Sequence, residues 1–364
     1  MNEDLRQKLG LEINEAEKDI SSEIEKVIPF NLDTTAENDT SSLPTNFIET
    51  KKEAKKIDIN KINIVDASPI EKEKDLRNAL FGNKSVFTII AAQSGYMAQM
   101  APLVHKDIIN IMSSNLNRFE RQKAIYKVVY DKIQSFSCGK LTFDEWLKLT
   151  SSGDIETFYY GIYCVTFPGL GEFTFECPNP DCEEQTTMKL DNANLIKTAN
   201  NEKMKKLIAK VSKQALSKDE MKKYSLIGKY DAYQLDDSGI IMELRTPSLW
   251  DVLDMLQKVP EKLIDRDAQS AEYLLYINRL LIPTQDDPEK YSEQTDRQEI
   301  FRIIDNLSID DAERLENSIS EKYDENRISY SVKNIECPKC KAKFKDTEIS
   351  IENILFTLIY EKAQ

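Results

Sequence analysis

The sequence predicts an α+β protein that is mainly α-helical with small β elements, and that carries a helical insertion between two cysteine-bearing segments. Three observations support this fold class. Apolar residues recur at helical spacing through much of the chain, short β-rich runs flank two pairs of cysteines, and a hairpin pattern lies between the pairs. Hydrophobic residues make up 40% and charged residues 31% of the 364-residue chain, which is the balance of a protein with a proper core.

Four cysteines are the most informative residues. Cys177 and Cys182 lie in FECPNPDCEE, and Cys337 and Cys340 lie in IECPKCKAK, each pair with a proline after its first cysteine. Each turn supplies two thiolates, whereas a structural zinc site takes four. We therefore expect the pairs to meet as one split four-cysteine zinc ribbon, which holds a structural Zn2+ and closes the insertion. The alternatives are two separate reduced thiol pairs, or disulfides, which a reducing cytosolic origin disfavours.

The predicted organisation has an arm, a helical domain, a divided ribbon, an insertion and a final helix. The boundaries are 1–66 for an extended N-terminal arm with a short amphipathic helix and linker, 67–170 for the helical domain, 171–192 and 328–350 for the two halves of the zinc ribbon, 193–327 for the mostly helical insertion with a hairpin near 229–245, and 351–364 for the C-terminal helix.

The arm carries a candidate partner-binding surface. Ile13, Ile20 and Ile24 recur at the period of one helix face, and a polar stretch from Asn31 to Asn60 follows them. A short amphipathic helix on a tether cannot bury its stripe alone. It packs back on its own domain or docks on a partner subunit, and the sequence leaves both possibilities open.

The remaining elements follow from caps and apolar spacing. Ser68-Pro69 is a helix start, and the nearly all-apolar and small run 85–104 predicts a buried helix. Leu141 to Asp144 opens a helix around Trp146. Further helices are predicted at 117–135, from 153, at 203–216, from 246, at 267–282, 296–306 and 309–322, and along the stripe of Ile351, Ile354, Leu355, Leu358 and Ile359, with hairpin strands at 230–235 and 240–245.

The charge of the chain argues against nucleic acid as a partner. The formal net charge is −14, which opposes phosphate binding. A local basic cluster surrounds the second cysteine pair and an acidic one the first, so the two are expected to neutralise each other when the pairs meet. These residues are Lys339, Lys341, Lys343 and Lys345 on one side and Asp181, Glu183 and Glu184 on the other.

The sequence predicts no enzyme and no membrane segment. His105 is the single histidine, and neither a nucleophile motif nor a phosphate-binding glycine loop accompanies it. Cys138 and Cys164 lie among apolar residues, as buried free thiols do. No stretch suits a secretory signal or a membrane span, so we expect synthesis in the cytoplasm.

One stretch resembles a known family. From about residue 124 to 190 the chain runs through a helix, the turn CGKL, a helix start at Asp154, a strand and the CPNPDC turn, and IGKYDAYQLDDSGIIMELRTPSLWDVL follows. This order is similar to that of the T-even-type bacteriophage baseplate hub family. The resemblance implies a structural component of a contractile tail baseplate, or a factor in hub assembly. It also implies other tail and baseplate proteins as partners in a multi-copy assembly, and location in the virion. The alternative function is a zinc-ribbon transcription or DNA-processing factor.

Overall fold

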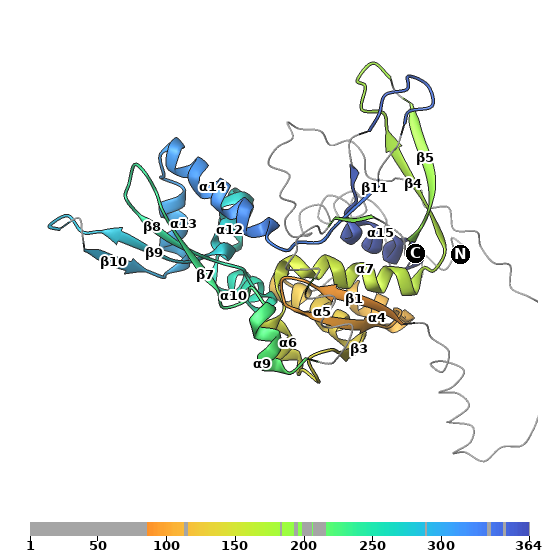
Figure 1. Cartoon of the computed structure of the whole chain (residues 1–364), viewed down its shortest axis with the longest axis horizontal. Helices are drawn as coiled ribbons and strands as arrows, with labels where there is room; N and C mark the ends of the chain where they lie inside the picture. The colour runs from red at the N-terminus through yellow and green to blue at the C-terminus, as the bar shows by residue number, and fades with distance from the viewer. Residues whose placement is uncertain are drawn as a thin grey trace, which may run out of the picture. The chain divides into compact units, whose positions relative to one another are not determined.

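The structure, a computed structural model, describes residues 86–112, 116–182, 184–192, 196–198, 206, 216–287, 290–332, 336–344 and 347–363. All of them belong to one compact unit that extends from Thr40 to Gln364. The fold is α+β, as predicted. In this described part of the chain, helices are combined with four antiparallel sheets (Figure 1), so strands are more prominent than the mainly α-helical prediction implied.

Residues 87–100 form a β-hairpin, so the buried helix predicted over 85–104 was wrong. The physical reason is a long-range contact at the turn. The carboxylate of Asp154 accepts hydrogen bonds from the backbone N–H groups of Gln93 at 3.2 Å and Ser94 at 2.7 Å. These bonds fix a four-residue turn that ends at Gly95, whose φ is +79°. The hairpin belongs to a sheet of order β1-β2-β3, formed by β1 (Phe87–Ala91), β2 (Tyr96–Met100) and β3 (Ile133–Phe136).

Five helices pack around this sheet and form the body of the protein. Side-chain caps start two of them: Asn117 accepts from the N–H of Glu120, and Thr142 forms a reciprocal capping box with Glu145. Helix α7, most of which is buried, packs against β1, β2 and the last helix of the chain. The helices are α4 (His105–Ile111), α5 (Arg118–Asp131), α6 (Phe143–Leu149), α7 (Ile155–Thr166) and α15 (Ile351–Ala363).

The insertion is built on a four-stranded sheet. The predicted hairpin is present, but the helix predicted over 267–282 ends at Tyr276, and the chain continues as a strand from Ile277. That strand pairs with a neighbour on each side, and this tertiary pairing overrides the local helical pattern. The sheet order is β10-β9-β8-β7, with β7 (Tyr230–Gln234), β8 (Ile241–Arg245), β9 (Ile277–Pro283) and β10 (Tyr291–Gln294).

Helices complete the insertion, and polar caps start most of them. Ser248 forms a capping box with Asp251, and the side chains of Asp267, Asp296 and Ser308 accept from backbone N–H groups of the helices that follow. Helices α12 and α14 contact the sheet, and α10 contacts α5 and α6 of the body. Their bounds are α10 (Leu249–Lys258), α11 (Glu261–Arg266), α12 (Ala268–Tyr276), α13 (Arg297–Ile304) and α14 (Ile309–Asp324).

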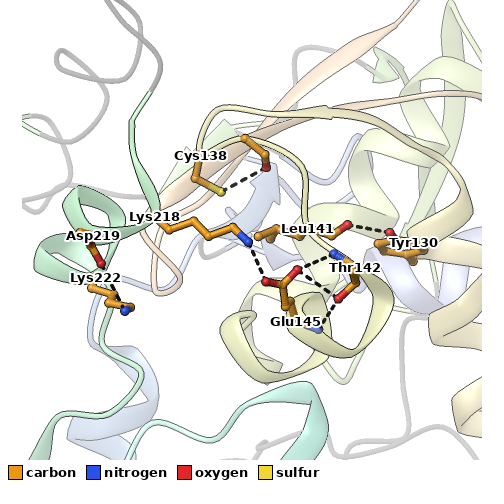
Figure 2. A network of polar contacts seen from close by, with 9 residues as sticks. Tyr130, Cys138, Leu141, Thr142, Glu145, Lys218, Asp219 and Lys222 are labelled. Atoms are coloured by element: carbon orange, nitrogen blue, oxygen red, sulfur yellow. Dashed lines mark hydrogen bonds and ion pairs between the residues drawn. The ribbon is translucent and has the colours of Figure 1, made fainter.

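A further helix, α9 (Lys218–Tyr224), connects the insertion to the body. Figure 2 shows the contact: the ammonium of Lys218 lies 2.6 Å from Oε1 of Glu145, whose other oxygen closes the capping box of α6. Lys218 holds the pKa of the Glu145 carboxyl at about 2. Both side chains are about 40% exposed, so burial of Met221 anchors α9 more strongly than the ion pair does. The helix predicted over 203–216 lies almost wholly outside the described residues.

Gln93, in the turn of the first hairpin, holds both ends of the insertion. Its backbone oxygen accepts from the N–H of Leu226 at 2.7 Å, just before β7. Its side-chain amide donates to the carbonyl oxygens of Tyr323 and Glu325, both at 2.9 Å, where the chain leaves α14. Gln93 is itself only 2% exposed. Gln93 therefore adds a buried attachment of the insertion to the body, beside the contacts made by α9 and α10.

Five strands carry the two cysteine segments. Tyr330 of β11 stacks on Tyr160 of α7 with ring centroids 4.2 Å apart, so the second segment starts from the buried face of the body. The β4–β5 pair is a two-stranded hairpin, and the other three strands form a sheet of order β12-β11-β6. The bounds are β4 (Leu170–Glu176), β5 (Gln185–Asp191), β6 (Ile196–Thr198), β11 (Ser329–Val332) and β12 (Thr347–Glu348).

Candidate metal centre

The fold brings the four predicted cysteines together. Their sulfur atoms all lie within 4.8 Å of one another. Sγ of Cys177 lies 3.4 Å from Sγ of Cys340, and Sγ of Cys182 lies 3.9 Å from Sγ of Cys337. These pairs join residues 163 and 155 positions apart in the sequence, so the cluster exists only in the folded chain.

The first pair lies in the turn at the end of the β4–β5 hairpin. The ladder is continuous from Leu170↔Asp191 to Glu176↔Gln185, so Cys177 follows β4 directly. The N–H of Cys177 donates to the carbonyl of Glu184, and the N–H of Cys182 donates to the carbonyl of Asn179. This bonding bends the chain so that both thiols face the same point.

The second pair lies in a tighter turn. Glu336 and Lys343 form a β-bridge across it, and the N–H of Cys337 donates to the carbonyl of Ala342 at 2.9 Å. Lys341 adopts a left-handed conformation with φ of 60°. Its N–H donates to the carbonyl of Cys337 and closes the turn. Phe344, just beyond it, contacts the ring of Phe175 of β4 edge-on at 6.4 Å, which joins the two segments beside the thiols.

Backbone N–H groups are directed at three of the sulfurs. The donors are Asn179 to Cys177, Glu184 to Cys182 and Ala342 to Cys340. Each donor lies two residues after the cysteine it serves, and each such bond favours the thiolate form, which is the form that binds metal. The turns were expected to bring backbone amides to the ion, but the individual donors were not predicted, although their position two residues after a cysteine is visible in the sequence.

The thiols differ in how readily they ionise. The bond from Ala342 lowers the pKa of Cys340 to about 6, whereas burial raises the pKa of Cys177 to about 12. Four thiolates at these distances repel one another, and a dication at their centre removes that repulsion. Binding a metal here therefore releases protons, so affinity falls as the pH falls.

Two of the sulfur separations are close to those of a tetrahedral metal site, and all lie within 4.8 Å. With metal–sulfur bonds of about 2.3 Å, the edge of a regular tetrahedron is about 3.8 Å, close to the 3.4 and 3.9 Å separations. A disulfide requires about 2.05 Å, and all of these cysteines are free thiols. The four cysteines can thus bind one metal ion.

The mutual neutralisation of the two charged clusters stays a prediction, because only some of these charges lie in the described part of the chain. Lys341 lies 3.9 Å from Glu336 of its own segment. Among the described charges, no ion pair joins the second segment to Asp181 or Glu184, and Glu183 and Lys345 lie outside the described residues. The lysines at 339, 341 and 343 are exposed, as is Cys340, while Cys182 and Cys337 are buried.

The other residues singled out in the sequence are not at this centre. Cys138 and Cys164 are buried separately in the body core, as expected for structural thiols. His105 is exposed at the first position of α4. The proposed partner-binding residues Ile13, Ile20 and Ile24 lie outside the described residues.

No family model, curated protein or solved structure matches this chain. Among the helices that the structure describes, none is both long enough and apolar enough for a membrane span.

Proposed function

We propose that the four cysteines bind a single structural Zn2+ and that the site is a split zinc ribbon. The gathering of four sulfurs within 4.8 Å supports this, because structural zinc sites take four ligands, commonly thiolates, in a tetrahedron. All four positions are supplied by the protein, so no position is left for a substrate or a reactive water. The site joins two distant parts of the chain and acts as scaffold.

The metal is tested by elemental analysis and by cobalt substitution. We expect one zinc per chain, and Co2+ in its place should give the absorption of a tetrahedral four-thiolate site. Cys340→Ser and Cys182→Ser should each lose the metal. Cys138→Ser is the matched control and should keep it, because that thiol is buried away from the cluster. Two metals per chain, or full occupancy in Cys340→Ser, would contradict the single ribbon.

We further propose that the protein functions through protein–protein contacts as a structural component of a contractile phage tail baseplate, at the central hub or in its assembly. The order of motifs between residues 124 and 190 and a metal site with the chemistry of a scaffold support this proposal. Mass spectrometry of purified virions and of tail assembly intermediates tests it. The chain should be found in at least one of these preparations, and its absence from both would contradict the proposal.

A zinc-ribbon DNA-binding factor is the second candidate, because Lys339, Lys341 and Lys343 remain exposed beside the metal site. Phosphate contacts by these lysines would give binding that weakens steeply with salt. Duplex and single-stranded DNA should be titrated at physiological salt with the wild type and with the three lysines changed to glutamate. Binding that is abolished in the variant would favour this second function, and absence of binding by the wild type would exclude it.

A further inference from the structure

The insertion sheet ends in a strand whose outer edge is unpaired. In the order β10-β9-β8-β7, β7 pairs only with β8, and no other residue in the described part of the chain hydrogen-bonds its backbone. The strand, Tyr-Asp-Ala-Tyr-Gln, contains neither proline nor lysine, which commonly block such edges. Four of its five residues are exposed, and Tyr230 is 52% exposed.

The register shows which backbone groups point outward. The N–H of Leu235 donates to the carbonyl of Ile240, and this pair continues the ladder that follows with Gln234↔Ile241. Bonded and non-bonded pairs alternate in an antiparallel ladder. Asp231 and Tyr233 therefore bond to β8. The N–H and C=O groups of Tyr230, Ala232 and Gln234 point away from it.

We propose that β7 pairs antiparallel with β7 of a second copy of this chain, around a two-fold axis at Ala232. In this register Ala232 faces Ala232 of the partner subunit, and Tyr230 faces Gln234 of the partner subunit. Each of these pairs exchanges two N–H···O bonds, so every outward group of the strand is satisfied. The two four-stranded sheets become one continuous sheet.

Registers with the two-fold axis at a neighbouring residue are less favourable. An axis at Asp231 places two carboxylates opposite each other, which is destabilising. An axis at Tyr233 pairs Tyr230 with Asp236, which lies beyond the end of the strand. The axis at Ala232 uses the whole strand and opposes no like charges.

The side chains of β7 are also compatible with pairing between two copies of the strand. Asp231, the only charged residue of β7, is already held by the ammonium of Lys322 on α14. Helices α12 and α14 pack against the sheet through β9 and β8. A symmetric contact needs one self-complementary patch, and this strand is one. The proposal stands on the hydrogen-bond register and does not rest on the metal or on the baseplate function.

The test is the association state of the full chain in sedimentation across a concentration series. Ala232→Pro removes an N–H that points outward and no bond to β8, so the fold tolerates it at an edge. We expect the wild type to dimerise and Ala232→Pro to remain monomeric. Tyr291→Pro is the matched control on the opposite edge, where the bond from Thr284 to Lys290 places the N–H of Tyr291 outward by the same alternation. It should dimerise like the wild type.

A second variant distinguishes a loss of dimerisation from a folding defect caused by proline. Ala232→Lys keeps the strand geometry and places two like charges on the axis, which should raise the dissociation constant about tenfold or more. Amide exchange gives an independent readout: Tyr230, Ala232 and Gln234 should gain protection with concentration, while Asp231 and Tyr233 are protected throughout. A monomer with fast-exchanging outward amides at the highest concentration overturns the proposal, as does a dimer unaffected by both Ala232 variants.

Discussion

The carboxyl group of Glu272 lies in the interior of the insertion, and burial raises its pKa to about 7. Only 6% of the residue is exposed. In the unfolded chain a glutamate has a pKa of about 4.3, so the folded protein prefers the protonated form over a wider pH range. The stability that this preference contributes is fully present below pH of about 4 and is lost as the pH rises through about 7.

Glu272→Gln should remove this pH dependence. Relative to the wild type, the free energy of unfolding of the variant should increase by about 2 kcal/mol between pH 5 and pH 8, because only the wild type has to ionise a buried group in that range. Denaturant unfolding at several pH values measures this difference. Glu313→Gln, on the exposed face of α14, is the control and should follow the wild type. Parallel profiles for Glu272→Gln and the wild type would contradict the prediction.

Residue by residue, the metal centre was the most predictable part of the molecule. Proline-bearing cysteine pairs with β-rich flanks have few other uses, so Cys177, Cys182, Cys337 and Cys340 could be selected from the sequence. The partners of the charges around them could not be predicted, because these depend on side-chain directions at the two turns. Lys341 pairs within its own segment for that reason.

At the scale of elements, the close approach of α9 to the β1–β2 turn can be tested at Gly95. A Cβ at this position would lie 2.8 Å from the backbone nitrogen of Ser225 and 3.0 Å from the carbonyl oxygen of Met221. Gly95→Ala should therefore lower the free energy of unfolding by about 3 kcal/mol or more, from the left-handed backbone and from the displaced helix end together. Thermal or denaturant unfolding measures the change.

Gly139→Ala separates the two contributions. Its φ of +84° is also left-handed, but a Cβ there meets nothing within 4 Å. This variant should lose only about 1 kcal/mol. Equal losses in the two variants would show that the contact between α9 and the turn does not constrain the fold.

Elements with local signals were predictable, and elements fixed by distant contacts were not. The caps at Thr142, Ser248 and Ser308 mark helix starts that the structure has. The strands in 85–104 read as a helix because apolar side chains occupy both faces of the hairpin and hide the two-residue alternation. Its turn depends on Asp154, about sixty positions away. Likewise, β9 is a strand only because β8 and β10 pair with it.

For the whole molecule, the hydrogen bonds made by Gln93 determine which regions should lose amide protection when the metal is removed. The ribbon was expected to close the insertion, yet the insertion is also held at both ends by Gln93 and packed on the body through α10. Chelation should therefore expose the amides of the β4–β5 turn and of residues 336–344, while the insertion sheet keeps its protection. Hydrogen exchange before and after chelation measures this.

Gln93→Ala removes the side-chain hydrogen bonds to the insertion instead of the metal. It should leave the metal in place and weaken protection where the chain leaves α14, because two carbonyl groups lose their donor. Loss of protection across the whole insertion on chelation, with no effect of Gln93→Ala, would show that the metal is the main closure.

The order of the two cysteine segments along the chain also determines when the metal centre can form during synthesis. Cys182 and Cys337 are 155 positions apart. At about 5–20 residues per second, the first pair waits roughly 8 to 30 seconds for the second. In that interval the ribosome delivers the strands and helices of the insertion, and the first two thiolates hold at most half of a site. The metal centre can consequently be completed only late in the synthesis of each chain. A complete centre shows that the whole insertion between the two cysteine turns has been synthesised.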